Sequence, residues 1–154
     1  MVVAIDQNGL IGSKGKMPWL NKEDLKWFKQ ITIHKKILMG RVTYENLGKP
    51  LMDRELIILS KNEAYEVDQT VGWVCHQPAL FLPIWAKQNE PYMLCGGKAI
   101  YELGLPYTQE IYLSLMEGTY QGDTYLNLDL SHFKLISSEN RTGFQLFHYQ
   151  RIDK

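Results

Sequence analysis

The sequence is poor in cysteine and has no excess of charge of either sign. Its two cysteines, Cys75 and Cys95, lack the paired spacing of a zinc ribbon or a redox motif, so we expect buried thiols in a reducing compartment. Seventeen basic residues balance seventeen acidic residues. Because no net field attracts nucleic acid or an anionic membrane, we expect neither as a partner, and any anionic ligand must be held by local groups.

Long apolar runs and the common catalytic signatures are also missing from the sequence. No stretch approaches the roughly 18 apolar residues of a membrane-spanning helix, and the first residues, MVVAIDQNG, lack the order of a signal peptide, so we expect a cytoplasmic protein. Neither G-x-S-x-G nor G-x-x-x-x-G-K-[ST] occurs, and the four histidines have no ligand-like spacing. Nucleophilic catalysis therefore lacks support, and we expect no metal.

Short apolar runs separated by turn residues predict a series of strands. They lie at residues 2–5, 36–40, 55–60, 71–74, 92–96 and 111–116. The earlier runs are apolar throughout, which is typical of parallel strands covered on both faces. Helical patterns between the strands supply the crossovers that parallel strands need, and they lie at residues 22–31, 41–47, about 79–88 and 98–103.

The last third of the chain alternates apolar and polar residues. Residues 133–138 and 143–152 flank a turn-prone segment at 139–143, which predicts an antiparallel hairpin. We therefore predict one domain over residues 1–154, an α/β three-layer sandwich with a mostly parallel central sheet of about eight strands, an antiparallel C-terminal hairpin strand and four main helices on both faces. Ligands of such sheets bind beyond the carboxyl ends of the strands.

Asp24 is an acidic residue near the start of the first predicted helix. With Asn21 as the N-cap, Asp24 would occupy the third helical position, where a carboxylate favours the helix dipole, and this is an ordinary structural role. Trp27, Phe28 and Ile31 follow it at i+3, i+4 and i+7, on the face that meets the core or a cleft. A carboxylate there is costly without partners, which favours a site acid that binds two parallel N–H donors. Local sequence leaves both interpretations open.

Three strand-to-helix junctions carry residues suited to phosphate binding. Residues 40–43 (GRVT) follow a strand and open a helix, where free backbone N–H groups attract anions. Residues 60–62 (SKN) add a cation after the next strand, and residues 95–101 (CGGKAIY) contain a glycine pair that allows close backbone approach. Each motif also has an ordinary interpretation as a solvated helix start or a simple turn. Together they indicate a ligand with several phosphates.

These motifs, taken together, resemble those of the dihydrofolate reductase family. The run from Leu10-Ile11-Gly12 through Met17-Pro18-Trp19 to Asp24, Phe28 and Thr32 matches that family's signature and its spacing. The later matches are G-R-x-T at 40–43, P-L-x-x-R at 50–54, I-I-L-S at 57–60, G-G-x-x-I-Y at 96–101 and G-D-T at 122–124. The resemblance covers essentially the whole chain, and the order of the motifs makes it specific.

The resemblance implies NADPH-dependent reduction of 7,8-dihydrofolate to 5,6,7,8-tetrahydrofolate in one-carbon and thymidylate metabolism. Hydride would go to pterin C6 and a proton to N5. The enzyme would be a cytoplasmic monomer that binds NADPH, dihydrofolate and antifolate-type inhibitors. Two alternatives remain: a related reductase of riboflavin synthesis, in which the P-W-x4-D arrangement is not expected, and a folate- or nucleotide-binding module without turnover.

Matched positions give the site residues their implied roles. Asp24 would hold the pterin and assist protonation, Ser114 would hydrogen-bond this acid, and Trp19 would complete the catalytic group. Substrate would contact Val2, Val3, Leu25, Phe28, Leu47, Leu51, Arg54 and Cys95, with Arg54 pairing with the folate α-carboxylate. The cofactor would contact Ala4, Ile11, Gly12, Gly40, Arg41, Val42, Thr43, Leu59, Ser60, Lys61, Cys95, Gly96, Gly97, Lys98, Ala99, Ile100, Tyr101 and Thr124. Residues 9–20 would form a mobile loop over the nicotinamide.

Three features depart from the family's pattern. Val2 stands where other residues usually precede the first strand, so we expect that strand to be short. Lys61 replaces a usual serine or threonine, so its role at the 2′-phosphate rests on charge alone. Pro83 falls inside a predicted helix, which a proline would break unless the helix starts later.

Overall fold

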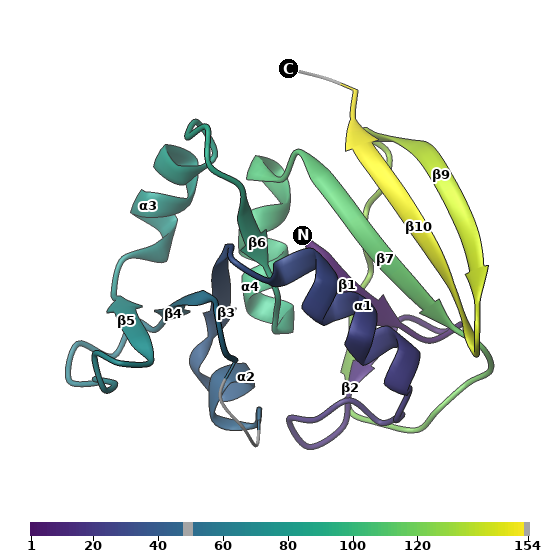
Figure 1. Ribbon diagram of the computed structural model, residues 1–154, viewed down its shortest axis with the longest axis horizontal. Coiled ribbons are helices and arrows are strands. Elements are labelled where there is room, and N and C mark those ends of the chain that lie inside the picture. The colour runs from purple at the N-terminus through teal and green to yellow at the C-terminus, as the bar shows by residue number, and fades with distance from the viewer. Residues whose placement is uncertain (48–50, 153–154) are drawn as a thin grey trace. The chain divides into compact units, whose positions relative to one another are not determined.

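The computed structural model describes residues 1–47 and 51–152 of the chain, which form two compact units (Figure 1). The first unit comprises Met1–Lys29 and Thr108–Lys154, and the second comprises Gln30–Tyr107. Pro50, the first residue of the P-L-x-x-R motif, lies outside the described residues. None of the described helices combines the length and apolar composition that crossing a membrane requires.

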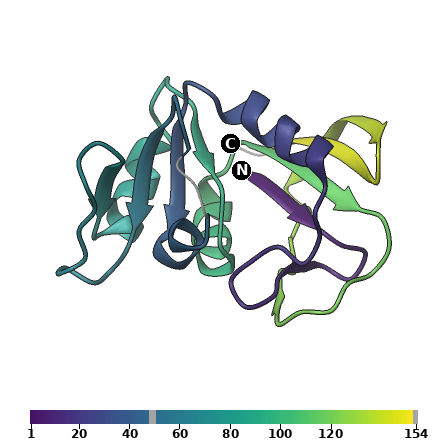
Figure 2. The same cartoon turned by 60° about the horizontal axis from the view of Figure 1, so that its bottom comes forward.

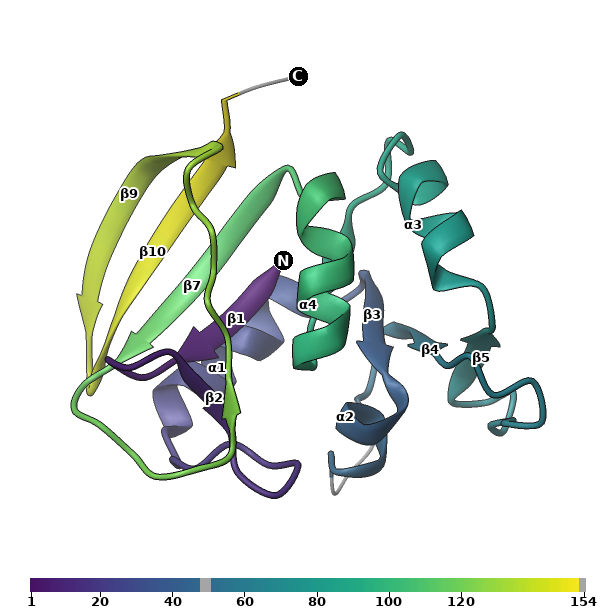
Figure 3. The ribbon, with the colours of Figure 1, turned by 180° about the vertical axis from the view of Figure 1, so that it is seen from behind.

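The first unit is built on a four-stranded sheet. Its strands are ordered β1 (Val2–Ile5), β7 (Glu110–Met116), β10 (Phe144–Arg151) and β9 (Phe133–Arg141), and they lie side by side in the rear view of Figure 3. β1 is parallel to β7, whereas β10 is antiparallel to both of its neighbours. A separate two-stranded ladder joins β2 (Leu10–Gly12) to β8 (Thr124–Tyr125).

Helix α1 (Lys22–Thr32) begins in this unit, and part of the core lies beside it. Trp19, Met116, Phe144 and Leu146 are buried together, with Ala4 and Trp27 packed against them. On β10 the apolar residues alternate with polar Gln145, as expected for a strand with one covered face. The core therefore brings the start of α1 against the strands β7 and β10.

The second unit contains a four-stranded parallel sheet. Its order is β5 (Gly72–Cys75), β4 (Glu55–Leu59), β3 (Lys36–Gly40) and β6 (Tyr92–Leu94), and Figure 2 shows the strands from a second direction. Its helices are α2 (Arg41–Glu45), α3 (Pro78–Trp85), α4 (Lys98–Gly104) and the short η1 (Leu105–Tyr107). Residues 37–39 and 56–59 are all buried, which explains why these parts of β3 and β4 are apolar without alternation.

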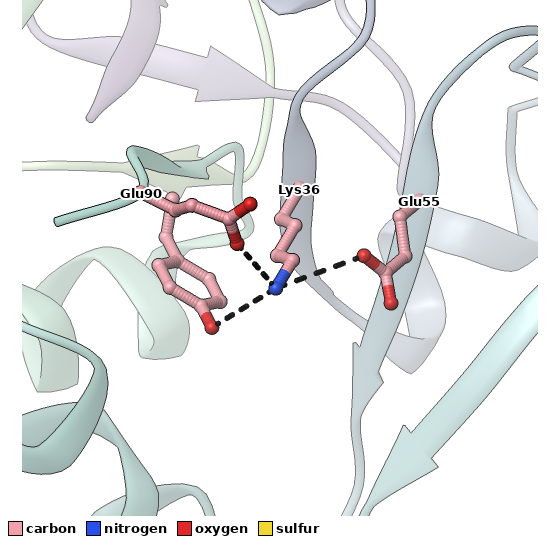
Figure 4. A network of polar contacts seen from close by, with 4 residues as sticks. Lys36, Glu55 and Glu90 are labelled. Carbon is pink, nitrogen blue, oxygen red and sulfur yellow. Dashed lines mark hydrogen bonds and ion pairs between the residues drawn. The ribbon is translucent and has the colours of Figure 1, made fainter. Parts of the chain in front are cut away.

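A charged cluster joins the amino ends of three of these strands (Figure 4). The Nζ of Lys36 lies 2.7 Å from an oxygen of Glu90 and 4.0 Å from one of Glu55, and it donates a 3.5 Å hydrogen bond to the Tyr92 hydroxyl. The hydrogen bond to Glu90 is the main cause of a raised Lys36 pKa. Because the cluster lies opposite the carboxyl ends of the strands, we interpret it as structural.

The predicted fold class is confirmed, with parallel and antiparallel strands and four α-helices. The described residues contain ten strands, so the predicted number of about eight was low. The additional strands are β2 and β8, which have three and two residues. Such short strands form only through pairing with each other, and local sequence carries little signal for them.

Two boundary predictions were wrong. The predicted turn at 139–143 is shorter, because residues 139–141 extend β9 and pair with β10. Pro83 does not break α3, which runs from Pro78 to Trp85. Pro83 lacks the N–H that would bond to the carbonyl of Ala79, but stacking of Trp85 on Phe81, with 5.6 Å between ring centroids, supports the helix by packing.

Candidate active site

The start of α1 presents a buried carboxylate. The Asn21 side chain accepts a 3.0 Å hydrogen bond from the backbone N–H of Asp24, and the Asn21 carbonyl accepts one from Leu25 N–H, so Asn21 is the N-cap. Asp24 therefore lies at the third helical position, and its own side chain is not the cap. Only 6% of Asp24 is exposed. The third position lets the carboxylate favour the helix dipole, as the ordinary interpretation expects, but that role does not require the carboxylate to be buried.

Ser114 on β7 is the hydrogen-bond partner of Asp24. Its Oγ lies 2.7 Å from Oδ1 of Asp24, and both residues are buried. Burial raises the pKa of Asp24, and the hydrogen bond from Ser114 partly opposes the rise. Desolvation disfavours the ionised form of an acid, and hydrogen bonding to that form favours it. Asp24 is therefore a carboxylic acid whose pKa is raised by its burial.

Trp19 adds a buried indole to this unit. Its ring meets Tyr120 edge-on, with 5.5 Å between centroids. The Nε1 of Trp19 is inaccessible to solvent and has no hydrogen-bond partner among the described residues. A buried donor of this kind is costly unless a bound molecule or water accepts from it. Trp19 can therefore take part in ligand binding as well as in packing.

The other expected site residues of the first unit are spread over its strands and α1. Val2 and Val3 are buried on β1, and Ala4 is the register partner of Ser114. Ile11 is half-buried and Gly12 is buried on β2, with Gly12 paired to half-buried Thr124 on β8. On α1, Phe28 is half-buried and Leu25 is exposed. The predicted loop at 9–20 contains a tight reversal in which Ser13 and Lys16 exchange backbone hydrogen bonds.

In the second unit, two of the predicted junctions are in direct contact. Gly40 donates its N–H to the carbonyl of Gly96 over 2.8 Å. A Cβ on Gly40 would lie 3.1 Å from the Ile100 side chain, and one on Gly97 would lie 3.1 Å from the Thr43 hydroxyl. Gly96 has φ +114°, a conformation that favours glycine. The glycines therefore form a cradle in which the two junctions pack closely, and a larger side chain at Gly40 or Gly97 would have to displace Ile100 or Thr43.

The remaining expected residues of this cradle belong to α2 and α4. Val42 is exposed and Thr43 half-buried, and on α4 Lys98 and Ala99 are exposed while Tyr101 is buried. These exposures leave the polar starts of both helices open to a ligand.

The third junction lies at the end of β4, the strand next to β3. Gly40 and Leu59 are register partners, so Arg41 and Ser60 follow neighbouring strand ends. Ser60 is buried, and its Oγ accepts a 3.3 Å hydrogen bond from Asn62 N–H. Lys61 is exposed.

The Arg41 guanidinium sits over a ring from the loop after β4. It lies 5.6 Å from the centroid of Tyr65 and 3.8 Å from Glu45. This contact places Arg41 beside the loop that carries Lys61. Two cations therefore belong to adjacent loops, an arrangement suited to a phosphate group.

Arg54 is held by contacts within the second unit. Its Nε donates to the carbonyl of Met52 over 3.0 Å, and its Nη1 donates to the Thr32 hydroxyl over 3.1 Å. Burial lowers the Arg54 pKa, but a guanidinium remains charged in proteins. Two further expected substrate residues, Leu47 and Leu51, are half-buried. The arginine is thus oriented before any ligand binds.

Cys95 follows β6, and its thiol is protonated at neutral pH and therefore unreactive. Burial raises the pKa of its thiol to about 12. A thiol is nucleophilic only when it is deprotonated. Among the described residues, no group of three or more metal-binding side chains is found.

Several residues that shape these sites were not identified from sequence. Asp6 is fully buried and accepts hydrogen bonds from the backbone N–H groups of Asn8, Leu10 and Tyr120. Burial opposes ionisation of Asp6, but these hydrogen bonds together lower its pKa. An aspartate directly after a buried strand and before Asn-Gly is typical of a side chain that organises a turn, and this signal could have found it. Thr32, which orients Arg54, was recognised only as part of a motif.

Comparisons with known proteins agree with this geometry. The family model described as dihydrofolate reductase matches residues 1–151. The chain is similar to the dihydrofolate reductase of Lactococcus lactis, with 33% identity covering 99% of this chain and 98% of the relative. It is also similar to that of Mycoplasma pneumoniae, with 32% identity covering 97% of this chain and 95% of the relative.

A solved structure extends the agreement to the fold. It is described as dihydrofolate reductase from Enterococcus faecalis complexed with NADP(H) and RAB-propyl. The TM-score is 0.87 at 29% identity, and the match covers 99% of this chain and 95% of that chain. Together with the match over residues 1–151, this likeness leads to one conclusion: the chain belongs to the dihydrofolate reductase family.

Proposed function

We propose that this protein reduces 7,8-dihydrofolate to 5,6,7,8-tetrahydrofolate with NADPH, as a cytoplasmic monomer in which residues 1–154 act as one functional domain. The observation that carries the proposal is the buried Asp24–Ser114 pair at the start of α1. A carboxylate buried to this extent, with a serine hydroxyl as its hydrogen-bond partner, is suited to a ligand that offers further hydrogen-bond donors. The pterin of dihydrofolate supplies such a ligand.

Asp24 recognises the pterin and favours its protonation. Its two oxygens accept from the 2-amino group and N3, two donors offered side by side. Its negative charge then favours a proton on N5 of the same ring, which makes C6 a better hydride acceptor. NADPH, when bound, supplies the hydride. Ser114 keeps the carboxylate oriented through its 2.7 Å hydrogen bond.

The substrate's other end is recognised by Arg54. Its contacts with Met52 and Thr32 use Nε and Nη1, so Nη2 and the outer edge of Nη1 remain for the folate α-carboxylate. Val2, Val3 and Cys95 are proposed as further substrate contacts. Leu25, Phe28, Leu47 and Leu51 supply apolar contacts for the pterin and benzoyl rings, and antifolate-type inhibitors would use the same groups.

The strand-to-helix junctions of the second unit are proposed to bind the cofactor. Ala4, Ile11, Gly12 and Thr124 are proposed as further cofactor contacts. Gly40, Gly96 and Gly97 are proposed to bind the pyrophosphate through their backbone, beside the exposed starts of α2 and α4. Arg41 and Lys61 supply positive charge for the 2′-phosphate, which distinguishes NADPH from NADH. Val42, Thr43, Leu59, Ser60, Lys98, Ala99, Ile100 and Tyr101 complete the proposed contacts.

One assay separates this proposal from its two rivals. Purified protein is mixed with NADPH, and the absorbance of the reduced nicotinamide is followed after dihydrofolate is added. We expect dihydrofolate-dependent loss of absorbance, faster with NADPH than with NADH. Binding of both molecules without turnover by either cofactor would instead identify a binding module. The riboflavin-pathway reductase is disfavoured because Pro18, Trp19 and Asp24 form the P-W-x4-D arrangement.

A further inference from the structure

The turn between β9 and β10 makes two hydrogen bonds to side chains at the start of α1. Thr142 donates its backbone N–H to Oε2 of Glu23 over 3.0 Å, and its carbonyl accepts a 2.8 Å hydrogen bond from Nδ2 of Asn21. Both polar backbone groups of one turn residue are therefore taken by side chains of the helix start. The two segments lie 119 and 121 positions apart in the chain.

The same turn is also bonded to the strand that carries Ser114. The carbonyl of Gly143 accepts a 3.0 Å hydrogen bond from the N–H of Glu117, directly after β7. In Figures 1 and 3 the end of β7, the start of α1 and the β9–β10 turn lie close together. The turn therefore joins the helix that carries Asp24 to the strand that carries its partner.

Asn21 connects this turn to the acid directly. Its side-chain oxygen accepts from Asp24 N–H over 3.0 Å, while its side-chain nitrogen donates to the Thr142 carbonyl. A single amide group thus fixes the backbone of Asp24 relative to the turn. An aspartate would cap the helix equally well, but an ionised carboxylate has no donor for the Thr142 carbonyl.

Gly143 allows the close approach of these segments. Its φ is +82°, in the left-handed region that favours glycine, and a Cβ at this position would lie 2.8 Å from Nδ2 of Asn21. Any other residue would have to push away the amide that holds Asp24. The need for glycine here is therefore linked to the helix start as well as to the turn.

Glu23 adds a charged acceptor to the contact. Its hydrogen bonding with Thr142 is the main cause of a lowered Glu23 pKa, and Arg141 and Lys26 lower the pKa further. Glu23 therefore stays ionised at neutral pH, and hydrogen bonds to ionised acceptors are stronger than those to neutral ones.

We propose that the Thr142–Gly143 turn positions the catalytic carboxylate by fixing the start of α1 against β7. Asn21, Glu23, Thr142 and Gly143 are positioning residues that act through Asp24. Their effect on catalysis rests on the proposed function, whereas their effect on the Asp24–Ser114 contact does not. A displacement of about 1 Å at a catalytic group can lower a rate by up to about a hundredfold.

The experiment compares two alanine substitutions at glycines of similar backbone conformation. Gly143→Ala introduces a Cβ against Asn21. Gly118→Ala is the matched control, because Gly118 has φ +80° and its added Cβ would meet nothing within 4 Å. Both variants carry comparable backbone strain, and only the first disturbs the contact with α1. Thermal unfolding reports the loss of stability in each.

The decisive measurement is the titration of the Asp24 carboxyl carbon, followed by NMR in the wild type and both variants. Among the described residues, the shift of the Asp24 pKa arises from burial and Ser114, with no contribution from a charged side chain. Loosening the turn should weaken the bond from Ser114 and raise the Asp24 pKa by roughly half a unit in Gly143→Ala. We expect kcat to fall about three- to tenfold, with unchanged NADPH affinity, and we expect no Asp24 shift in Gly118→Ala.

The outcomes separate this proposal from the proposed function. An unchanged Asp24 titration in Gly143→Ala, or the same shift in both variants, would overturn the positioning role. If the wild type fails to reduce dihydrofolate, the proposed function fails, but the titration still decides the positioning role.

Discussion

Removal of the Ser114 hydroxyl should raise the pKa of Asp24 and move the pH–rate profile to higher pH. In the wild type, burial raises this pKa and the 2.7 Å hydrogen bond from Ser114 opposes the rise. Ser114→Ala removes the opposing contribution and leaves Asp24 buried. Loss of this hydrogen bond destabilises the ionised carboxylate more than the neutral acid, so Asp24 keeps its proton to a higher pH.

The size of the shift follows from the strength of the lost bond. A hydrogen bond to a charged group contributes about 1.5–3 kcal/mol and one to a neutral group about 0.5–1.5 kcal/mol. The difference, slightly over about 1 kcal/mol, corresponds to roughly one pKa unit. We therefore expect the Asp24 titration to move up by about one unit in Ser114→Ala, and the acid limb of the kcat profile, where Asp24 loses its charge, to move up with it.

Steady-state NADPH oxidation measured across the pH range checks this prediction. Ser114→Thr, which keeps the hydroxyl, is the matched variant and should shift the profile much less. An unchanged limb in Ser114→Ala, or a limb that moves to lower pH, would refute the proposed link between Ser114, Asp24 and the rate.

Three further predictions concern charge. Arg41→Gln should raise the KM for NADPH much more than that for NADH, because only NADPH carries the 2′-phosphate, and equal effects would remove Arg41 from that site. Arg54→Leu should weaken dihydrofolate binding with little change for NADPH, and a substrate fragment without the glutamate tail should be indifferent. Asp24→Asn should raise the free energy of unfolding at neutral pH. The pKa of Asp24 is higher in the folded protein than in the unfolded chain, so protonation of Asp24 stabilises the fold. This stabilisation is complete below pH 3.8 and is lost as the pH rises through the raised folded-state pKa. Thermal unfolding should therefore show the gain of Asp24→Asn at neutral pH and its disappearance in acid.

Much of the fold could be predicted because the strong local signals agree with the tertiary structure. After their charged first residues, β3 and β4 are apolar and are buried along most of their length, in agreement with the prediction of covered parallel strands. The residues 139–141 show the limit of such signals. Glu139, Asn140 and Arg141 favour turns locally, yet pairing with β10 keeps them extended. Cross-strand contacts outweigh local propensity there.

The candidate site could be predicted only in part. Asp24 could be singled out because its helical spacing put a costly carboxylate on the face that meets the core or a cleft, although its place at the third helical position also fitted an ordinary structural role. Ser114 lies 90 positions away, and only the family resemblance pointed to it. The contacts of Thr142 with Asn21 and Glu23 had no sequence signal, since they join a backbone turn to side chains more than a hundred residues distant.

The most direct test of the account is the turnover of Asp24→Asn, which keeps the shape of the side chain and removes its charge. We expect kcat for dihydrofolate to fall by about two to four orders of magnitude at neutral pH, the usual contribution of a positioned acid–base group. Partial recovery at low pH and nearly unchanged NADPH binding should accompany the loss, because solvent then supplies the proton. Turnover at the wild-type rate at neutral pH would contradict the central role assigned to Asp24.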